Sequence, residues 1–204
     1  MTPAARISAA ITVLDQILAG SPAEQALLRW SRASRFAGSG DRAALRDLVF
    51  GALRQRDSLA ALGGGLTGRG LMIGHVRQSG PSLDAIFTGE GHAPSPLTEA
   101  EAAVVPPDPL PDDLPDWLRP AWRQALGDQA DAVALAMTQR APVWLRVNGS
   151  RATPEQAAAV LAADGITVEA APQLASALRV VSGDRLVARS SAYLDGLVEL
   201  QDLS

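Results

Sequence analysis

Apolar residues recur every three or four positions through the first half of the chain, which is the spacing of an amphipathic helix. Over residues 4–18, Ile7, Ile11 and Leu14 fall on one face, and Gly20 follows as a stop signal. The same spacing predicts a helix carrying Ala26, Leu27 and Trp30, and further helices at roughly 41–56, 70–78, 82–88 and from 98 onward. Everything up to residue 105 is therefore predicted to be helical.

Three pairs of residues have the pattern of a capping box. In such a box a hydroxyl side chain and a Glu or Gln three positions later satisfy backbone amides at the start of a helix. The pairs are Ser21 with Glu24, where Pro22 takes the first helical position, Thr98 with Glu101, and Thr153 with Gln156.

After residue 116 the pattern changes to a mixture of helices and strands. Two helical stretches come first, "DWLRPAWRQALG" and "DQADAVALAMTQ". Four segments are then predicted as strands, with a helix after the first and a helical turn at "SSAYL" before the last: "PVWLRVN", "ITVEAA", "ALRVVSG" and "GLVELQD". This order predicts a small ferredoxin-like or RRM-like α/β layer.

The stretch "VPPDPLPDDLPD" at 105–116 separates the two patterns. It holds five prolines and four aspartates, and proline removes a backbone donor and biases its neighbours to extended geometry. We therefore predict a linker or extended strap at 106–116, between a helical domain at 1–105 and a second domain at 117–204. The predicted fold class is α+β, an all-α domain followed by a small α/β domain.

Charge is distributed unevenly along the chain, although its net value is only −4. Residues 1–80 carry a net charge of +5, residues 81–116 carry −8 and residues 117–204 carry −1. All 18 basic residues are arginine. A GC-rich coding sequence is the simplest explanation for the absence of lysine. The planar guanidinium nevertheless suits phosphate, so the basic first region is a candidate nucleic-acid surface.

Several arginines are distinguished by their positions. Arg29, Arg32 and Arg35 recur every three residues and form a ridge. The candidate RNA-binding residues, which would contact phosphates, are Arg42, Arg46, Arg54, Arg56, Arg140, Arg146, Asn148 and Arg151. Solvated helix faces and an internal pair such as Arg42–Asp47 or Arg46–Asp47 explain the same residues, and for the whole set the sequence leaves the two explanations balanced.

The sequence offers little for catalysis or metal binding. There is no cysteine, so disulfides and thiolate nucleophiles are excluded, and two histidines, His75 and His92, are too few to predict a metal site. The glycine-rich "LGGGLTGRG" follows a helix and lacks a Gly-Lys-Ser/Thr sequence, so it predicts an interhelical loop and not a phosphate loop. No catalytic, cofactor-binding or metal-ligating residue is predicted.

Nothing in the sequence predicts a membrane partner. No apolar run reaches the ~18 residues that a membrane-spanning helix needs, and the first residues lack the apolar core of a secretory signal. The chain is therefore predicted to be cytoplasmic.

Three segments together resemble one protein family. "DRAALRDLVFGALRQRDSL" is similar to the central helix of NusB-type all-α domains. "APVWLRVNGSRATPEQAAAVLAADGI" is similar to the small α/β domain that precedes the catalytic domain in bacterial RsmB (Fmu/Sun) RNA cytosine-C5 methyltransferases. The ending "GLVELQDLS" resembles that family's junction, where a Gln-Asp-x-Ser segment leads into the methyltransferase fold. The order matches across essentially the whole chain, but the catalytic domain is missing.

The resemblance implies a function as well as a fold. In that family a cysteine thiolate adds to C6 of cytosine, S-adenosylmethionine methylates C5, and a second cysteine assists product release. The cysteines and the cofactor site would lie in a domain expected after Ser204. These 204 residues are then the RNA-recognition region of an enzyme and not an enzyme by themselves. Their expected partners are RNA of the 16S ribosomal class and the protein's own catalytic domain, with no cofactor in this chain.

Two other hypotheses remain open at this point. One is a free-standing, non-enzymatic NusB-like adaptor for RNA or protein. The other is that the basic helical domain mainly docks on the catalytic domain, with its arginines paired internally.

Overall fold

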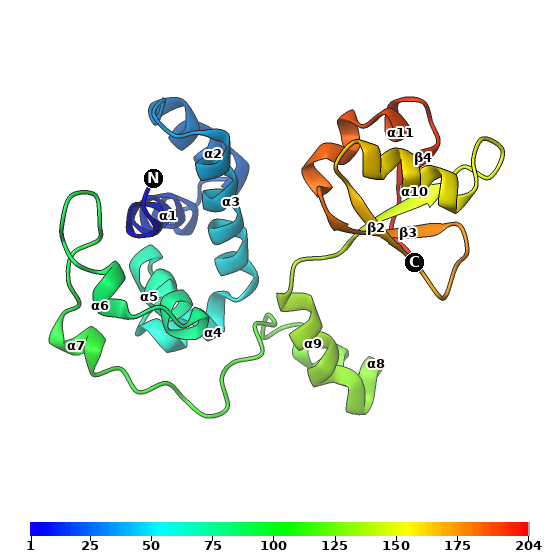
Figure 1. Ribbon diagram of the computed structural model, residues 1–204. Coiled ribbons are helices and arrows are strands. Elements are labelled where there is room, and N and C mark those ends of the chain that lie inside the picture. Colours follow the sequence, from blue (N-terminus) through cyan, green and yellow to red (C-terminus); the bar gives the residue numbers. More distant parts are fainter. Residues whose placement is uncertain (204) are drawn as a thin grey trace. The chain divides into compact units, whose positions relative to one another are not determined.

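The structure is a computed structural model that describes residues 1–203, and the chain divides into two compact units, Met1–Arg140 and Ala141–Ser204 (Figure 1). The first unit is helical, and the second combines a sheet with helices. This order confirms the predicted α+β fold class.

Helices of very different lengths build the first unit. Their bounds are α1 Pro3–Leu18, α2 Ala23–Ala33, α3 Ser39–Arg54, α4 Arg56–Gly63, α5 Gly68–Ser79, α6 Leu83–Ile86, α7 Glu99–Ala102, α8 Arg119–Leu126 and α9 Ala130–Thr138, with a 3-10 turn at Gly127–Gln129. The core draws fully buried side chains from α1, α3, α4 and α5, among them Leu14, Leu45, Leu59 and Leu71. Each such leucine contributes about 1.5–3 kcal/mol of burial free energy.

Helices α4 and α5 approach each other so closely that glycine is required at their contact. A Cβ atom on Gly63 would overlap the backbone carbonyl of Gly70, and one on Gly74 would overlap the carbonyl of Leu59. The segment "LGGGLTGRG" is thus the turn between two helices and the close-packed start of α5, as predicted.

Residues 105–116 form an extended strap that one carboxylate fixes to α4. Asp113 accepts hydrogen bonds from the backbone N–H groups of Asp57 and Ser58, at 2.8 Å each, and from Ser58 Oγ at 2.6 Å. The two N–H groups have no partner within their own helix, so a strap residue caps α4 from 55 positions away. Asp113 has φ of 58°, a left-handed conformation that Asp adopts more readily than most residues.

The second unit is an antiparallel sheet with strand order β2-β3-β1-β4. Helix α10 connects β1 to β2, and a 3-10 segment followed by α11 connects β3 to β4. The bounds are β1 Val143–Val147, α10 Pro154–Ala163, β2 Thr167–Ala170, β3 Ala177–Ser182, the 3-10 segment Asp184–Arg189, α11 Ser191–Leu194 and β4 Val198–Leu200. This topology is the predicted ferredoxin-like arrangement.

The two faces of this sheet differ in chemistry. Leu145, Val147, Leu178 and Val180 are buried in a core that they share with α10. Because side chains alternate along a strand, their neighbours lie on the opposite face. That face carries Trp144, Arg146, Arg179, Glu169 and Glu199.

Two of the three predicted capping boxes form, and one does not. Thr98 with Glu101 and Thr153 with Gln156 make the expected reciprocal bonds. The prediction for Ser21 was wrong, because Pro22 is the residue that precedes α2 and no side chain caps that helix. Instead, the Ser21 N–H donates to Gln16 O at 2.9 Å, so this residue belongs to the turn that closes α1.

Three further predictions concern boundaries. The helix expected at 41–56 ends at Arg54, and Gln55 separates it from α4. The domain boundary at 106–116 stays a prediction, since those residues lie inside the first unit and the division between units follows Arg140. Ser204, the last residue of the predicted junction, lies outside the described residues.

Among the described residues, no helix combines the length and the apolar character that crossing a membrane requires.

Candidate nucleic-acid interface

Three of the predicted RNA-binding residues come together in the second unit. Arg146 on β1, Asn148 just after it and Arg151 before α10 line a pocket of about 610 Å³. The other wall is formed by Leu194, Asp195, Gly196, Val198 and Glu199. The chain turns between the end of β1 and the start of α10, so Arg146 and Arg151 come close to each other.

Each of these three residues is also engaged within the unit. Arg146 forms an ion pair with Glu199 on β4, across the β1–β4 ladder. Arg151 Nη1 donates to the carbonyl of Asp195 at 2.7 Å, and Asn148 Nδ2 donates to Gly196 O at 3.3 Å. Because these contacts tie the β1 turn to the approach to β4, the residues have a structural role whether or not RNA binds. Glu199 also balances the charge of Arg146.

The predicted residues of the first unit are spread along α3 and α4 and are mostly paired. Three of them have partners inside the unit: Arg46 with Glu24 Oε2 (3.2 Å), Arg54 Nε with Thr138 O (3.3 Å) and Arg56 with Asp57 Oδ1 (3.0 Å). Arg140 is exposed and also has an interaction partner. Only Arg42, among the predicted residues of this unit, has no side-chain partner within the described residues.

Exposed arginines without an internal partner concentrate in one short segment. Arg29 and Arg32 lie on α2, Arg35 lies in the connection that follows, and Arg42 lies in the first turn of α3. The guanidinium groups of these four, the α2–α3 arginine cluster, form no hydrogen bond or ion pair within residues 1–203. Arg29, Arg32 and Arg35 were absent from the predicted RNA-binding set, although their three-residue repeat was the signal that could have placed them there.

The acidic residues nearest in sequence to this cluster are already neutralised. Asp41 accepts a hydrogen bond from Arg6 Nη2 at 2.8 Å and lies 3.1 Å from the N-terminal amino group. These interactions, the Arg6 bond first, hold the pKa of Asp41 below its ordinary value. Since Glu24 pairs with Arg46, neither acid offsets the charge of the α2–α3 arginine cluster.

In contrast to that cluster, Arg69 and Arg77 of α5 are hydrogen-bonded to groups within the first unit. Arg69 donates to both carboxylate oxygens of Glu101 at 2.7 and 3.0 Å, bonds the carbonyls of Ser95 and Pro96, and stacks over a phenylalanine ring. Arg77 donates to the Leu62 and Glu101 carbonyls. The Arg69 hydrogen bonds lower the pKa of Glu101 to about 2. These arginines hold loop 87–101 against α5 and are not available to a ligand.

Two residues on the open face of the sheet, Trp144 and Arg179, were absent from the predicted RNA-binding set. Trp144 lies opposite Arg179 in the β1–β3 register, and Arg179 pairs with Glu169 of β2 at 2.8 Å. An aromatic side chain on the open face of a four-stranded sheet is a feature that RNA-binding modules use for base stacking. The alternation in "PVWLRVN" was sufficient to place Trp144 and Arg146 on one face.

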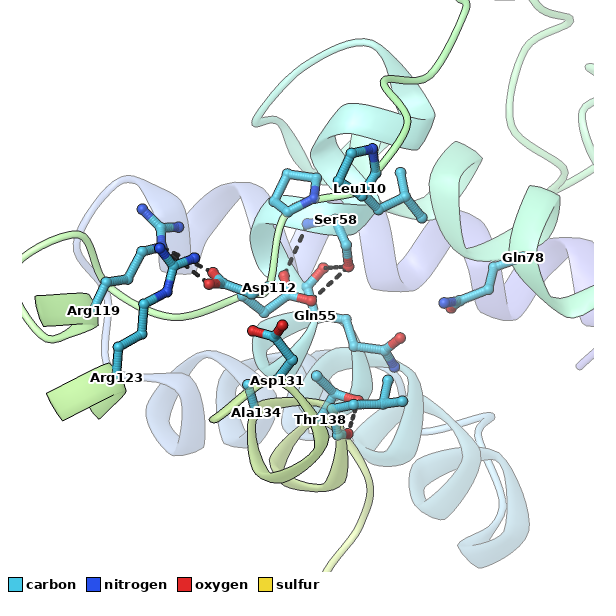
Figure 2. Close-up of a pocket in the computed structure, with 14 residues that line it drawn as sticks. Gln55, Ser58, Gln78, Leu110, Asp112, Arg119, Arg123, Asp131, Ala134 and Thr138 are labelled. Atoms are coloured by element: carbon cyan, nitrogen blue, oxygen red, sulfur yellow. Dashed lines mark hydrogen bonds and ion pairs between the residues drawn. The ribbon is translucent and has the colours of Figure 1, made fainter. Parts of the chain in front are cut away.

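A second pocket, of about 570 Å³, lies between the strap, α4, α8 and α9 (Figure 2). Figure 2 shows Arg119 and Arg123 pointing toward Asp112. Arg119 Nε donates to Asp112 Oδ1 at 3.0 Å. Burial is the largest influence on Asp112 and opposes its ionisation, but the hydrogen bonds from Arg119 and the Leu114 N–H, together with the charges of Arg119 and Arg123, outweigh it, so the pKa of Asp112 lies below its ordinary value. The charged groups of this pocket thus mainly hold the strap in place.

The glycine-rich loop and the residue types that ligate metals are the remaining features to place in the structure. No group of three potential metal ligands gathers within residues 1–203. The amides of the glycine-rich loop are engaged within the unit: Gly68 N–H donates to Asp15 Oδ1 at 2.7 Å, and Gly70 N–H donates to Thr67 Oγ1 at 2.9 Å. His75 is mostly buried in α5, and burial lowers its pKa.

Comparison with known proteins identifies part of the chain. Residues 114–185 match the family model described as "Methyltr_RsmF/B-like, ferredoxin-like domain". A stretch of 88 residues is 39% identical to Ribosomal RNA small subunit methyltransferase B of Xanthomonas campestris pv. campestris. That match covers 43% of this chain and 20% of the relative, so the shared region spans about a fifth of the longer protein.

One solved structure resembles the chain over its whole length. The crystal structure of PH0851 aligns with 100% of this chain and 54% of its own, with a TM-score of 0.55 and 17% sequence identity. At that identity the likeness concerns the fold alone. The likeness of the helical unit to NusB-type domains stays a prediction. Residues 114–185 are therefore similar to the ferredoxin-like domain of RsmF/B-like methyltransferases, and this match confirms the resemblance to the RsmB family.

Proposed function

We propose that this chain is an RNA-recognition region of an S-adenosylmethionine-dependent ribosomal RNA cytosine-C5 methyltransferase. The observation that carries the proposal is the family match of residues 114–185, together with a relative named as a small-subunit ribosomal RNA methyltransferase. RNA of the 16S class is accordingly the proposed substrate, and a catalytic domain of the same protein is the proposed partner.

The chemistry of the chain supports a recognition role. Its 204 residues contain no cysteine, so they cannot supply a thiolate nucleophile to cytosine. An exposed arginine cluster on one unit and an aromatic and basic sheet face on the other are suited to holding phosphates and unstacked bases. Enzymes that modify a base in RNA need that base out of its stack, and a region that holds the strand contributes to this.

S-adenosylmethionine would be bound by residues outside this chain. The amides of the one glycine-rich loop are hydrogen-bonded internally, and that loop joins two helices instead of following a strand. The cofactor's methyl group is what the complete enzyme would transfer. The role proposed for these residues is to position the RNA.

Two titrations on the 204-residue chain test the proposal. We expect small-subunit ribosomal RNA to bind with an affinity that falls steeply as salt rises, because arginine–phosphate contacts release counterions. We expect S-adenosylmethionine to give no heat of binding in isothermal titration. Absence of RNA binding at low salt would contradict the recognition role, and micromolar affinity for S-adenosylmethionine would contradict the assignment of the cofactor to other residues.

A further inference from the structure

We infer that the α2–α3 arginine cluster and the aromatic groove beside it form a binding site for single-stranded RNA, with the arginines on phosphates and Phe36 stacked on a base. This inference rests on the proposed function, since it identifies where and in what form the RNA is held. It places the main RNA contact in the segment 29–42, and not at the other predicted residues on α3, on α4 and around β1.

The first argument is the state of the arginines. Most arginines of the chain serve the fold, as Arg69, Arg77 and Arg119 do through carboxylates and carbonyls. The four of the α2–α3 arginine cluster are exposed and make no such bonds within the described residues. When an arginine makes no hydrogen bond within the protein, all its N–H donors can bind a ligand. The planar guanidinium group matches the geometry of phosphate oxygens.

The second argument is the groove. A groove of about 1020 Å³ is lined by Trp30 and Phe36, by small residues of α1 with Met1 and Thr2 before it, and by the loop residues Glu90, Gly91, His92 and Ala93. Its aromatic side lies at Trp30 and Phe36, and its one acidic group is Glu90 on the loop side. Trp30 is on α2 between Arg29 and Arg32, and Phe36 directly follows Arg35. Phe36 is 76% exposed, a large fraction for a phenylalanine. Cations and aromatic rings thus alternate along one short segment.

This combination favours a single strand over a duplex. A-form RNA presents a narrow major groove and paired, stacked bases, so an aromatic side chain cannot reach a base face. In a single strand the bases are accessible and each has a face for stacking, while the backbone still offers one phosphate per nucleotide. Alternating arginines and aromatics suit that repeat.

It also favours RNA over an acidic protein. An acidic peptide would satisfy the arginines, yet it would leave Phe36 and the groove without a matching group. Base stacking on an aromatic side chain uses both features at once. The contribution of Phe36 therefore separates the two kinds of partner.

The experiment measures binding of a fluorescein-labelled single-stranded RNA oligonucleotide to the 204-residue chain by anisotropy, over a range of salt concentrations. The variants are the triple Arg29→Ala/Arg32→Ala/Arg35→Ala and the single Phe36→Ala. In the triple variant we expect the slope of log K against log salt to become less steep by about 2, because each phosphate contact on a single strand contributes about 0.7 to it. We expect Phe36→Ala to weaken binding by roughly tenfold without changing that slope.

Two matched controls account for general effects of charge and apolar surface. Arg189→Ala removes another exposed arginine, in the second unit, and Met137→Ala removes an apolar side chain that is 58% exposed and lies away from the groove. Neither is expected to change RNA affinity by more than about twofold. All variants change exposed residues, so their circular dichroism and melting curves should match the parent chain.

The outcomes separate this inference from the proposed function. If the parent chain binds the oligonucleotide and both test variants bind it equally well, the site assigned here is wrong while RNA recognition stands. If the parent chain binds no RNA, the proposed function fails and the site with it. If polyglutamate displaces the RNA and Phe36→Ala has no effect, the cluster is a general polyanion site and the single-strand inference is overturned.

Discussion

The arginines of α5 and those of the α2–α3 segment have the same side chain and opposite roles. Arg69 makes bonds to a carboxylate and to two carbonyls, and its side chain is 24% exposed. The four residues of the α2–α3 arginine cluster are exposed, and their guanidinium groups form no hydrogen bond or ion pair within the described residues. Burial and bonding, and not residue type, therefore decide which arginines belong to the fold and which are available to a ligand.

The basic charge of residues 1–80 is partly neutralised by acidic residues that follow it in the sequence. The acidic segment 81–116 follows the basic segment 1–80 and supplies partners to its arginines, as Glu101 does to Arg69. Of the strap aspartates, Asp113 accepts hydrogen bonds from backbone N–H groups of α4, and Asp112 pairs with Arg119 of α8. Much of the positive charge that first indicated RNA is thus used internally, and the α2–α3 arginine cluster is the part that is not.

The largest effect on stability is expected for Arg69→Ala. The change leaves Glu101 without its main partner and releases loop 87–101, so it should lower the free energy of unfolding by about 2–3 kcal/mol. Urea unfolding followed by helical circular dichroism measures this. Arg32→Ala is the matched change, and it should stay within about 0.5 kcal/mol of the parent. Equal losses from both changes would remove the distinction between the two groups of arginines.

A smaller loss is expected for Asp113→Ala, which removes the cap that the strap provides to α4. Loss of an N-terminal cap costs about 0.5–2 kcal/mol. Asp108→Ala, an exposed change in the same strap, is the control and should cost almost nothing. If Asp113→Ala were as mild as Asp108→Ala in urea unfolding, the strap would not be a structural element of the first unit.

The pH dependence of stability tests the Arg69–Glu101 pair in another way. The folded-state pKa of Glu101 is about 2, below its ordinary 4.5, so this carboxylate stabilises the fold above pH 4.5 and the contribution is lost as pH falls toward 2. The difference in unfolding free energy between the parent chain and Glu101→Gln should therefore be constant above pH 4.5 and shrink below it. A difference that grows on acidification would have the wrong sign for this account.

The smallest effect is expected for Arg146→Ala. Its partner Glu199 is half exposed, and surface ion pairs contribute about 0.2–1 kcal/mol. The salt dependence of RNA binding should change by no more than about 0.7 in slope, the value of a single contact. A larger change would restore the pocket around Arg146, Asn148 and Arg151 as the principal RNA contact.

Much of the fold could be predicted from the sequence, because its signals are local. Helical spacing located α1 and α3, and the capping box at Thr153 located the start of α10. The order of elements predicted the ferredoxin-like unit before any strand pairing was visible. The failure at Ser21 has a local cause too, since two turns compete for the same residue and the one that ends α1 prevails.

The candidate site was less predictable, because it depends on contacts between distant residues. No spacing rule reveals that Arg54 bonds the carbonyl of Thr138 or that Arg69 bonds Glu101. When these pairs are not known, every arginine is an equal candidate for binding RNA. The predicted set therefore consisted of residues close to recognisable helices and strands. The three-residue repeat of Arg29, Arg32 and Arg35 was visible, but its significance depends on the absence of partners, which the sequence does not show.

The most direct test is an arginine footprint. Phenylglyoxal modifies exposed guanidinium groups, and the chain contains no lysine to complicate the mass spectra. In the free chain, Arg29, Arg32 and Arg35 should react readily, whereas Arg69 and Arg77 should react slowly. Addition of single-stranded RNA should protect the first three and leave the reactivity of the others unchanged. Protection confined to Arg146 and Arg151, with the α2–α3 arginine cluster still reactive, would contradict the account.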